Sequence, residues 1–123
     1  MYPSTEPLLL PLLPVPVRQP QTGALPGLLK ALADPTRLRI VGLLAQRELC
    51  VCDLETLLGV SQSMTSHHLG VLRRTGLLRQ RRDESDARWV YYRLHAEAID
   101  TFKDRFNAFL DLSAFDPTPA RCG

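Results

Sequence analysis

The 123-residue sequence contains no apolar run long enough to cross a membrane, and its charges nearly balance. A net charge of +2 does not by itself indicate a nucleic-acid partner, and 45% hydrophobic with 23% charged residues is ordinary for a soluble globular protein. No secretory leader is recognisable, because prolines interrupt the apolar run over residues 8–17 and no basic residue precedes it. We therefore expect one cytoplasmic domain without a membrane partner.

Cysteine is also scarce, and the three cysteines present are an odd number that would leave one unpaired among disulfides. Cys50 and Cys52 lie one residue apart, and Cys122 lies close to the C-terminus. In a reducing compartment, closely spaced cysteines more often serve metal or redox chemistry than a structural disulfide. Soft thiolates bind ions such as As(III), Cu(I), Zn(II) and Cd(II). The alternative is that the pair only packs in the core, as free cysteines often do.

Prolines set the expected boundaries of the folded part. Seven prolines within the first 26 residues exclude a helix or a central strand there, so residues 1–24 are expected to form a Pro-rich arm. Residues 113–123, which carry Cys122, are expected to form a flexible tail. The single folded domain is therefore expected over residues 25–112.

Capping residues mark the first long helix of this domain. Asp34 is a good N-cap, and the proline after it fits the first helical position, so a helix is expected over Pro35–Ala45. Leu38, Val41 and Leu44 recur at helical spacing and are expected to face the core.

Two further helices are separated by a short turn that contains glycine. Cys50–Leu58 is expected to be helical and to end at Gly59, while Ser61 is expected to cap a helix over Gln62–Thr75. This arrangement predicts a helix-turn-helix whose second helix enters the major groove of DNA.

The second of these helices is expected to turn Met64, Leu69 and Leu72 inward and its polar residues toward DNA. A hairpin is expected next, because Leu77–Arg82 and Arg88–Leu94 are strand-forming segments around a polar loop. Seven of the 15 lysines and arginines fall between positions 73 and 93, which favours a basic wing beside the recognition helix. The candidate DNA-binding residues are Gln62, Ser63, Thr65, Ser66, His67, Arg73, Arg82 and Arg88.

Two apolar stripes offer more surface than one small domain needs. One lies on an amphipathic helix expected over Ala96–Leu112, and the other on a short helix expected over Gly27–Ala33. Small helix-turn-helix proteins normally bind pseudo-palindromic operators as dimers. The residues expected at a homodimer interface are Leu28, Leu29, Leu32, Ile99, Phe102, Phe106 and Phe109.

The order of these motifs resembles the ArsR/SmtB family of metal-responsive transcriptional repressors, over residues 25–112. The matching stretches are residues 33–40 (ADPTRLRI), 48–54 (ELCVCDL), 61–63 (SQS), 68–69 (HL), 72–73 (LR), 76–78 (GLL) and 88–92 (RWVYY). The resemblance implies a homodimeric winged helix-turn-helix fold, mainly α with a small β-hairpin, that binds double-stranded operator DNA.

The Cys-Val-Cys stretch is similar to the arsenic-responsive branch of that family. This implies a repressor that leaves its operator when As(III) or Sb(III) binds the cysteines, with no organic cofactor. The best-known members of the branch carry a third cysteine where this sequence has Glu55. The family's zinc site on the last helix uses Asp and His pairs, and His95 stands alone here, so that site is not expected.

The spacing of the thiol pair restricts how it could hold an ion. Side chains at positions i and i+2 of a helix point about 200° apart, so Cys50 and Cys52 cannot share a small ion on a regular helix. Either the site lies in a nonhelical lead-in, or binding unwinds the first turn of the helix. Cys122 is the one remaining thiol that could complete a three-sulfur site, from the same chain or a partner's.

Three functions remain open at this stage. The first is a repressor released by As(III) or Sb(III), and the second is the same repressor controlled by thiol oxidation or by Cd(II) or Zn(II). The third is a thiol oxidoreductase, but no catalytic base, nucleotide loop or thioredoxin-like pattern supports an enzyme, and we nominate no catalytic residue.

Overall fold

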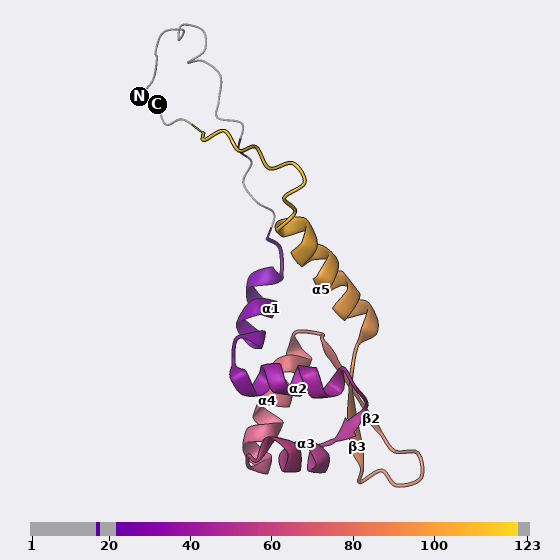
Figure 1. Cartoon of the computed structure of the whole chain (residues 1–123). Coiled ribbons are helices and arrows are strands. Elements are labelled where there is room, and N and C mark those ends of the chain that lie inside the picture. The colour runs from indigo at the N-terminus through magenta and orange to yellow at the C-terminus, as the bar shows by residue number, and fades with distance from the viewer. Residues whose placement is uncertain (1–16, 18–21, 121–123) are drawn as a thin grey trace, which may run out of the picture.

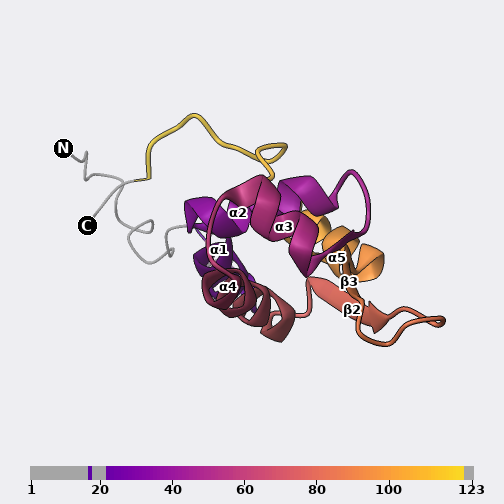
Figure 2. The ribbon, with the colours of Figure 1, turned by 90° about the horizontal axis from the view of Figure 1, so that it is seen from below.

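The computed structural model describes residue 17 and residues 22–120, so most of the proline-rich arm and Cys122 lie outside the described residues. The elements follow in the order α1 (Leu25–Leu32), α2 (Pro35–Leu44), β1 (Leu49–Cys50), α3 (Val51–Leu58), α4 (Gln62–Arg74), β2 (Leu78–Arg82), β3 (Val90–Leu94) and α5 (Ala96–Phe109). Helices α1 to α4 gather into one body and α5 extends away beside α1 (Figure 1), while the β2–β3 hairpin projects from the body (Figure 2). This is a winged helix-turn-helix.

Local sequence signals explain most element ends. The Asp34 carboxylate accepts a hydrogen bond from Arg37 N, and the Ser61 hydroxyl accepts one from Met64 N, so both predicted N-caps are confirmed. Gly59 ends α3 with a φ of 69°, a left-handed conformation that glycine adopts without steric cost. The last helix is shorter than expected and ends at Phe109.

The core lies between α2, α3, α4 and the start of the hairpin. All four elements contribute buried residues to it: Ile40, Leu44, Leu54, Leu58, Leu69, Leu72 and Leu78. Burial of this apolar surface is the main force that holds the helix-turn-helix together. Among the described residues, none of the helices combines the length and apolarity needed to cross a membrane.

Two residues expected in the core are exposed instead. Leu38 is 57% exposed and Met64 is 47% exposed. The buried face of α2 is defined by Ile40 and Leu44, and Leu38 lies about 200° around the helix from Ile40. The buried face of α4 is centred on Thr65, which displaces Met64 to its flank.

The sheet has a third strand that the sequence did not reveal. Strand β3 lies in the centre, with β2 on one side and the two-residue β1 on the other, and all pairs are antiparallel. In β1, Leu49 is opposite Tyr92 and Cys50 is opposite Tyr91. The first cysteine therefore belongs to the sheet that carries the wing, and α3 begins only at Val51.

Candidate nucleic-acid interface and thiol site

Helix α4 presents a polar surface at its N-terminal end. Gln62, Ser63, Ser66 and His67 are all exposed there, as the sequence predicted. Thr65 is a correction, because it is fully buried and its hydroxyl donates to Ser61 O at 2.9 Å. A side chain used inside its own helix turn is not available to a base edge, so Thr65 stabilises the turn.

His68 follows His67 about 100° around α4 and is buried. Its Nδ1 is 3.1 Å from Arg37 Nη1 and 3.9 Å from the carboxylate of Asp34. The Nε of Arg37 also donates to Ala31 O at 2.6 Å. These contacts join α4 to α2 and to the end of α1, so they fix where the recognition helix sits in the body.

One face of α4 continues from the polar N-terminal residues to the C-terminal end of the helix. Ser63, His67, Gly70 and Arg74 follow each other at spacings of four, three and four residues, which places them on one face of the helix. A Cβ built at Gly70 would lie 3.4 Å from Nη1 of Arg74, so this guanidinium folds back along that face. Arg74 is not among the DNA-binding residues expected from the sequence, which include the neighbouring Arg73.

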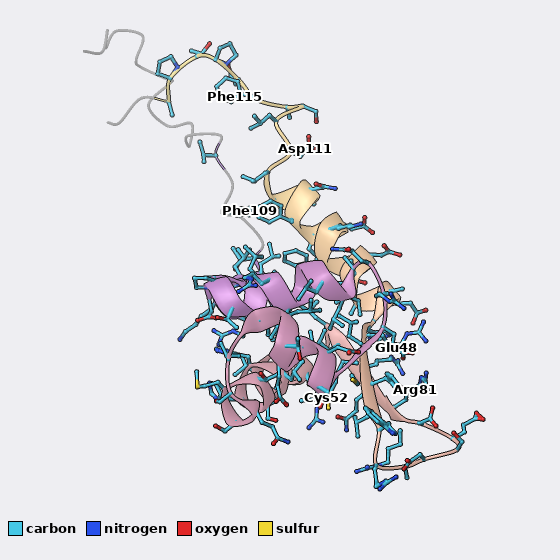
Figure 3. The ribbon with its side chains drawn as sticks, turned by 60° about the horizontal axis from the view of Figure 1, so that its bottom comes forward. Glu48, Cys52, Arg81, Phe109, Asp111 and Phe115 are labelled. Atoms are coloured by element: carbon cyan, nitrogen blue, oxygen red, sulfur yellow. The ribbon has the colours of Figure 1, made fainter. Side chains whose placement is uncertain are left out.

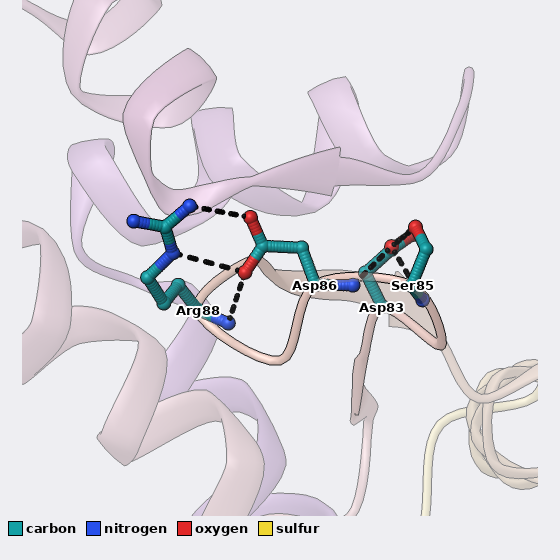
Figure 4. Close-up of polar contacts among 4 residues, drawn as sticks. All are labelled: Asp83, Ser85, Asp86 and Arg88. Atoms are coloured by element: carbon teal, nitrogen blue, oxygen red, sulfur yellow. Dashed lines mark hydrogen bonds and ion pairs between the residues drawn. The ribbon is translucent and has the colours of Figure 1, made fainter.

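Two arginines of the wing differ in their partners: Arg88 forms an ion pair, and Arg82 binds a backbone carbonyl. Arg88 donates to the Asp86 carboxylate through Nε at 3.0 Å and Nη2 at 2.8 Å (Figure 4). This ion pair lowers the pKa of Asp86, and a hydrogen bond from the Ser85 hydroxyl lowers the pKa of Asp83. Arg82 donates to the carbonyl of Ala87 at 2.8 Å and pairs with no acidic side chain among the described residues.

The two cysteines occupy different environments. Cys50 is 5% exposed and is the N-cap of α3 in an extended conformation, whereas Cys52 is exposed in the first helical turn. The Cys50 thiol is 3.2 Å from Asp53 Oδ2 and donates to it, while Cys50 Sγ accepts from Asp53 N at 3.4 Å. Burial raises the pKa of the Cys50 thiol. One thiol therefore lies in the nonhelical lead-in and the other on the helix.

Cys50 and Cys52 do not form a complete three-ligand metal site with other described residues. Within residues 22–120, the structure contains no group of three His, Cys, Asp or Glu side chains arranged to hold a metal ion. The thiols available to a thiophilic ion in this part are those of Cys50 and Cys52, near the start of α3. A three-sulfur site would take its third donor from elsewhere, and Cys122, the candidate from the sequence, lies outside the described residues.

The expected dimer surfaces are incompletely covered in one chain. No residue of α5 is fully buried, and Phe109 is 41% exposed. Ile99 and Phe102 line an open groove of about 760 Å³ between the end of α2, the end of β3 and the start of α5. Leu28 and Phe102 line a second groove of about 310 Å³ between α1 and α5. These apolar faces are available to a partner.

Comparison with known proteins places the chain among regulators. Residues 34–80 match the model of a family described as "Bacterial regulatory protein, arsR family". Over 73 residues the chain is 49% identical to the arsenic resistance transcriptional regulator ArsR1 of Pseudomonas putida, which covers 58% of this chain and 55% of that protein. It is 39% identical over 72 residues to the cadmium resistance transcriptional regulatory protein CadC of Listeria innocua, covering 58% of each. The matched part spans about half the length of these relatives.

Comparison with solved structures shows a similarity that covers nearly the whole of another protein. HlyU from Vibrio cholerae superposes with a TM-score of 0.58 and 35% sequence identity, over 72% of this chain and 94% of that chain. These similarities to regulators confirm the expectation that the chain is not an enzyme.

Proposed function

This chain belongs to the arsR family of bacterial regulatory proteins, and we propose that it is a transcriptional repressor that leaves its operator when a thiophilic ion binds Cys50 and Cys52. The observation that carries the proposal is that Cys50 caps α3, the helix that packs against the recognition helix α4. A change at these thiols therefore acts on the support of α4. The proposed operator is double-stranded DNA, and the protein acts in the cytoplasm.

In the proposed complex, the N-terminal half of α4 enters the major groove. Ser63, Ser66 and His67 contact base edges, with Gln62 at the helix start. Arg73 and Arg74 at the other end of α4 and Arg82 on the wing bind phosphates. Arg88 contributes less charge than its sequence suggests, because Asp86 neutralises it.

Two copies of the chain form the functional unit in this proposal. The apolar residues of α1 and α5 that remain partly exposed in one chain are expected to be covered by the same residues of a second copy. A two-fold dimer presents two copies of α4 to half-sites about one helical turn apart, which accounts for a pseudo-palindromic operator.

The proposed inducer is As(III) or Sb(III). Both thiols are near the start of α3, Cys50 as its extended N-cap and Cys52 in its first turn. In this proposal, an ion shared by the two sulfurs replaces the contacts between the Cys50 thiol and Asp53 and disturbs the first turn of α3. Similarity to cadmium regulators as well as arsenic regulators keeps Cd(II) as a second candidate, and thiol oxidation as a third.

Operator release measured by fluorescence anisotropy tests this proposal. As(III) should displace the wild-type protein, whereas Cys50→Ser and Cys52→Ser should bind operator normally and fail to respond. Serine keeps an N-cap acceptor at position 50, so that variant should stay folded. Parallel titrations with Cd(II) and peroxide separate the three inducer classes, and Cys122→Ser tests the third sulfur. Release of Cys50→Ser at the wild-type As(III) midpoint would refute the thiol site.

A further inference from the structure

A row of side chains crosses the sheet from β1, the strand that carries Cys50, to the wing strand β2. Cys50 of β1 is opposite Tyr91 of β3, and Tyr91 is opposite Arg81 of β2. Residues opposite each other in antiparallel strands project from the same face, with Cβ atoms about 4.5–5.5 Å apart. The side chains of Cys50, Tyr91 and Arg81 are therefore consecutive neighbours on one face of the sheet.

Arg81 also binds Glu48, the residue directly before β1. Its Nε donates to Glu48 Oε2 at 3.0 Å and its Nη2 donates to Glu48 Oε1 at 2.8 Å, a two-point ion pair. Its guanidinium carbon lies 4.9 Å from the centre of the Tyr91 ring. Glu48 precedes Cys50 by two residues, and Figure 3 shows Glu48 and Arg81 next to each other where β1 meets the hairpin.

The short strand β1 needs such a link to stay in register. Two residues form too few ladder hydrogen bonds to fix a strand firmly, whereas the planar guanidinium sets both the distance and the angle between Glu48 and β2. A backbone movement that carries Cys50 toward Cys52 displaces β1. Through Glu48 and Arg81, this displacement reaches β2 and therefore the wing.

We propose that Arg81 is a positioning residue that transmits ion binding at the thiols to the wing, and that Glu48 is its partner in this role. The inference rests on the proposed function, because it assumes an ion at Cys50 and Cys52. It adds a second route beside the one through α3 and α4. It also gives Arg81 a role other than phosphate binding, because Glu48 binds the Nε–Nη2 edge of its guanidinium and Tyr91 lies against one face.

The test compares three quantities for each variant of the full chain: operator affinity without As(III), As(III) affinity without DNA, and the factor by which As(III) weakens operator binding. Arg81→Lys keeps the charge but cannot form the two-point pair. Glu48→Gln keeps the shape and removes the charge. Each variant should bind operator and As(III) nearly as wild type does, while the weakening factor falls at least about fivefold, the low end of allosteric coupling.

Arg79→Lys is the matched control. Arg79 lies on the same strand two residues earlier, and its guanidinium contacts His95 at 3.0 Å instead of Glu48, so this variant should keep the wild-type weakening factor. The double variant Arg81→Lys with Glu48→Gln should lose no more than either single variant, because both changes break one link. If circular dichroism shows that Arg81→Lys is unfolded, Tyr91→Leu, which removes the ring under the guanidinium, replaces it.

Three results would overturn the inference. The first is an unchanged weakening factor in both Arg81→Lys and Glu48→Gln. The second is a fall in salt dependence for Arg81→Lys without As(III), which would make Arg81 a phosphate contact. The third is a wild-type protein that binds As(III) through its thiols and keeps its operator, and this result would also refute the proposed function, which the first two leave intact.

Discussion

Replacing Asp86 with asparagine should free Arg88 and make operator binding more dependent on salt. In the structure, Arg88 makes two side-chain hydrogen bonds to Asp86, so the pair presents almost no net charge to DNA. Asparagine keeps an oxygen for the hydrogen bond from Arg88 N, which lies 3.1 Å from Oδ1, so the loop should hold its shape. The freed guanidinium can then bind a phosphate.

The size of the effect follows from counterion release. One added phosphate contact steepens the slope of log affinity against log salt by about 0.9, so two wings of a dimer add about 1.8. Between about 50 and 200 mM salt, this is an additional loss of about twelvefold in affinity. Arg82→Ala should change the slope by a similar amount in the opposite direction, whereas Arg88→Ala should change it less.

Anisotropy titrations of labelled operator over this salt range measure all three slopes. The Arg88–Asp86 pair holds the pKa of Asp86 below its usual range, so the carboxylate stays charged and the ion pair should persist between about pH 5 and 8. A wild-type slope for Asp86→Asn, combined with an Arg88→Ala effect as large as that of Arg82→Ala, would show that the pair opens on DNA and would refute the argument.

Other perturbations test the body and the thiols. Leu54→Ala removes a fully buried side chain from the core beside the thiol segment and should lower the free energy of unfolding by about 2–5 kcal/mol in urea titrations, whereas Leu57→Ala, on the exposed side of the same helix, should change it little. Ser61→Ala should cost about 1 kcal/mol by loss of the N-cap of α4 and should also weaken operator binding. Iodoacetamide should modify the exposed Cys52 well before the buried Cys50, whose raised pKa leaves less thiolate at neutral pH, as peptide mapping by mass spectrometry can show.

The sequence was most informative where a local signal decides the structure. Asp34, Ser61 and Gly59 have side chains or backbone preferences that act within a few residues, and all three mark element ends as expected. The hairpin was equally readable, because strand-forming residues flank a polar loop. These signals sufficed to predict the winged helix-turn-helix.

The errors concern features that depend on distant residues. Leu38 and Met64 are apolar at helical spacing, yet they are exposed, because the packing of neighbouring helices chooses which side of α2 and α4 is buried. Thr65 is polar and yet central to the core face. Strand β1 has only two residues, and its existence depends on pairing with β3, about 40 positions later. Periodicity within a single element contains none of this information.

If an ion at the thiols releases the operator as proposed, the energies involved favour an effect on both α4 and the wing. A hundredfold loss of operator affinity requires about 2.7 kcal/mol. Loss of a good N-cap costs about 0.5–2 kcal/mol, and a thiol such as that of Cys50 is a weaker acceptor than a hydroxyl. Helix α4 has its own cap at Ser61 and its own buried leucines, so only part of the change in α3 reaches it.

The sheet row from Cys50 to Arg81 supplies the remaining effect in this account, and the two routes leave different signatures on operator binding. Movement of α4 should reduce the preference for operator over unrelated DNA, whereas movement of the wing should lower the salt slope through the loss of Arg82 contacts. We expect the As(III)-bound protein to show both changes in competition and salt titrations. A lower sequence preference with an unchanged salt slope would assign release to α4 alone and contradict the route through the sheet.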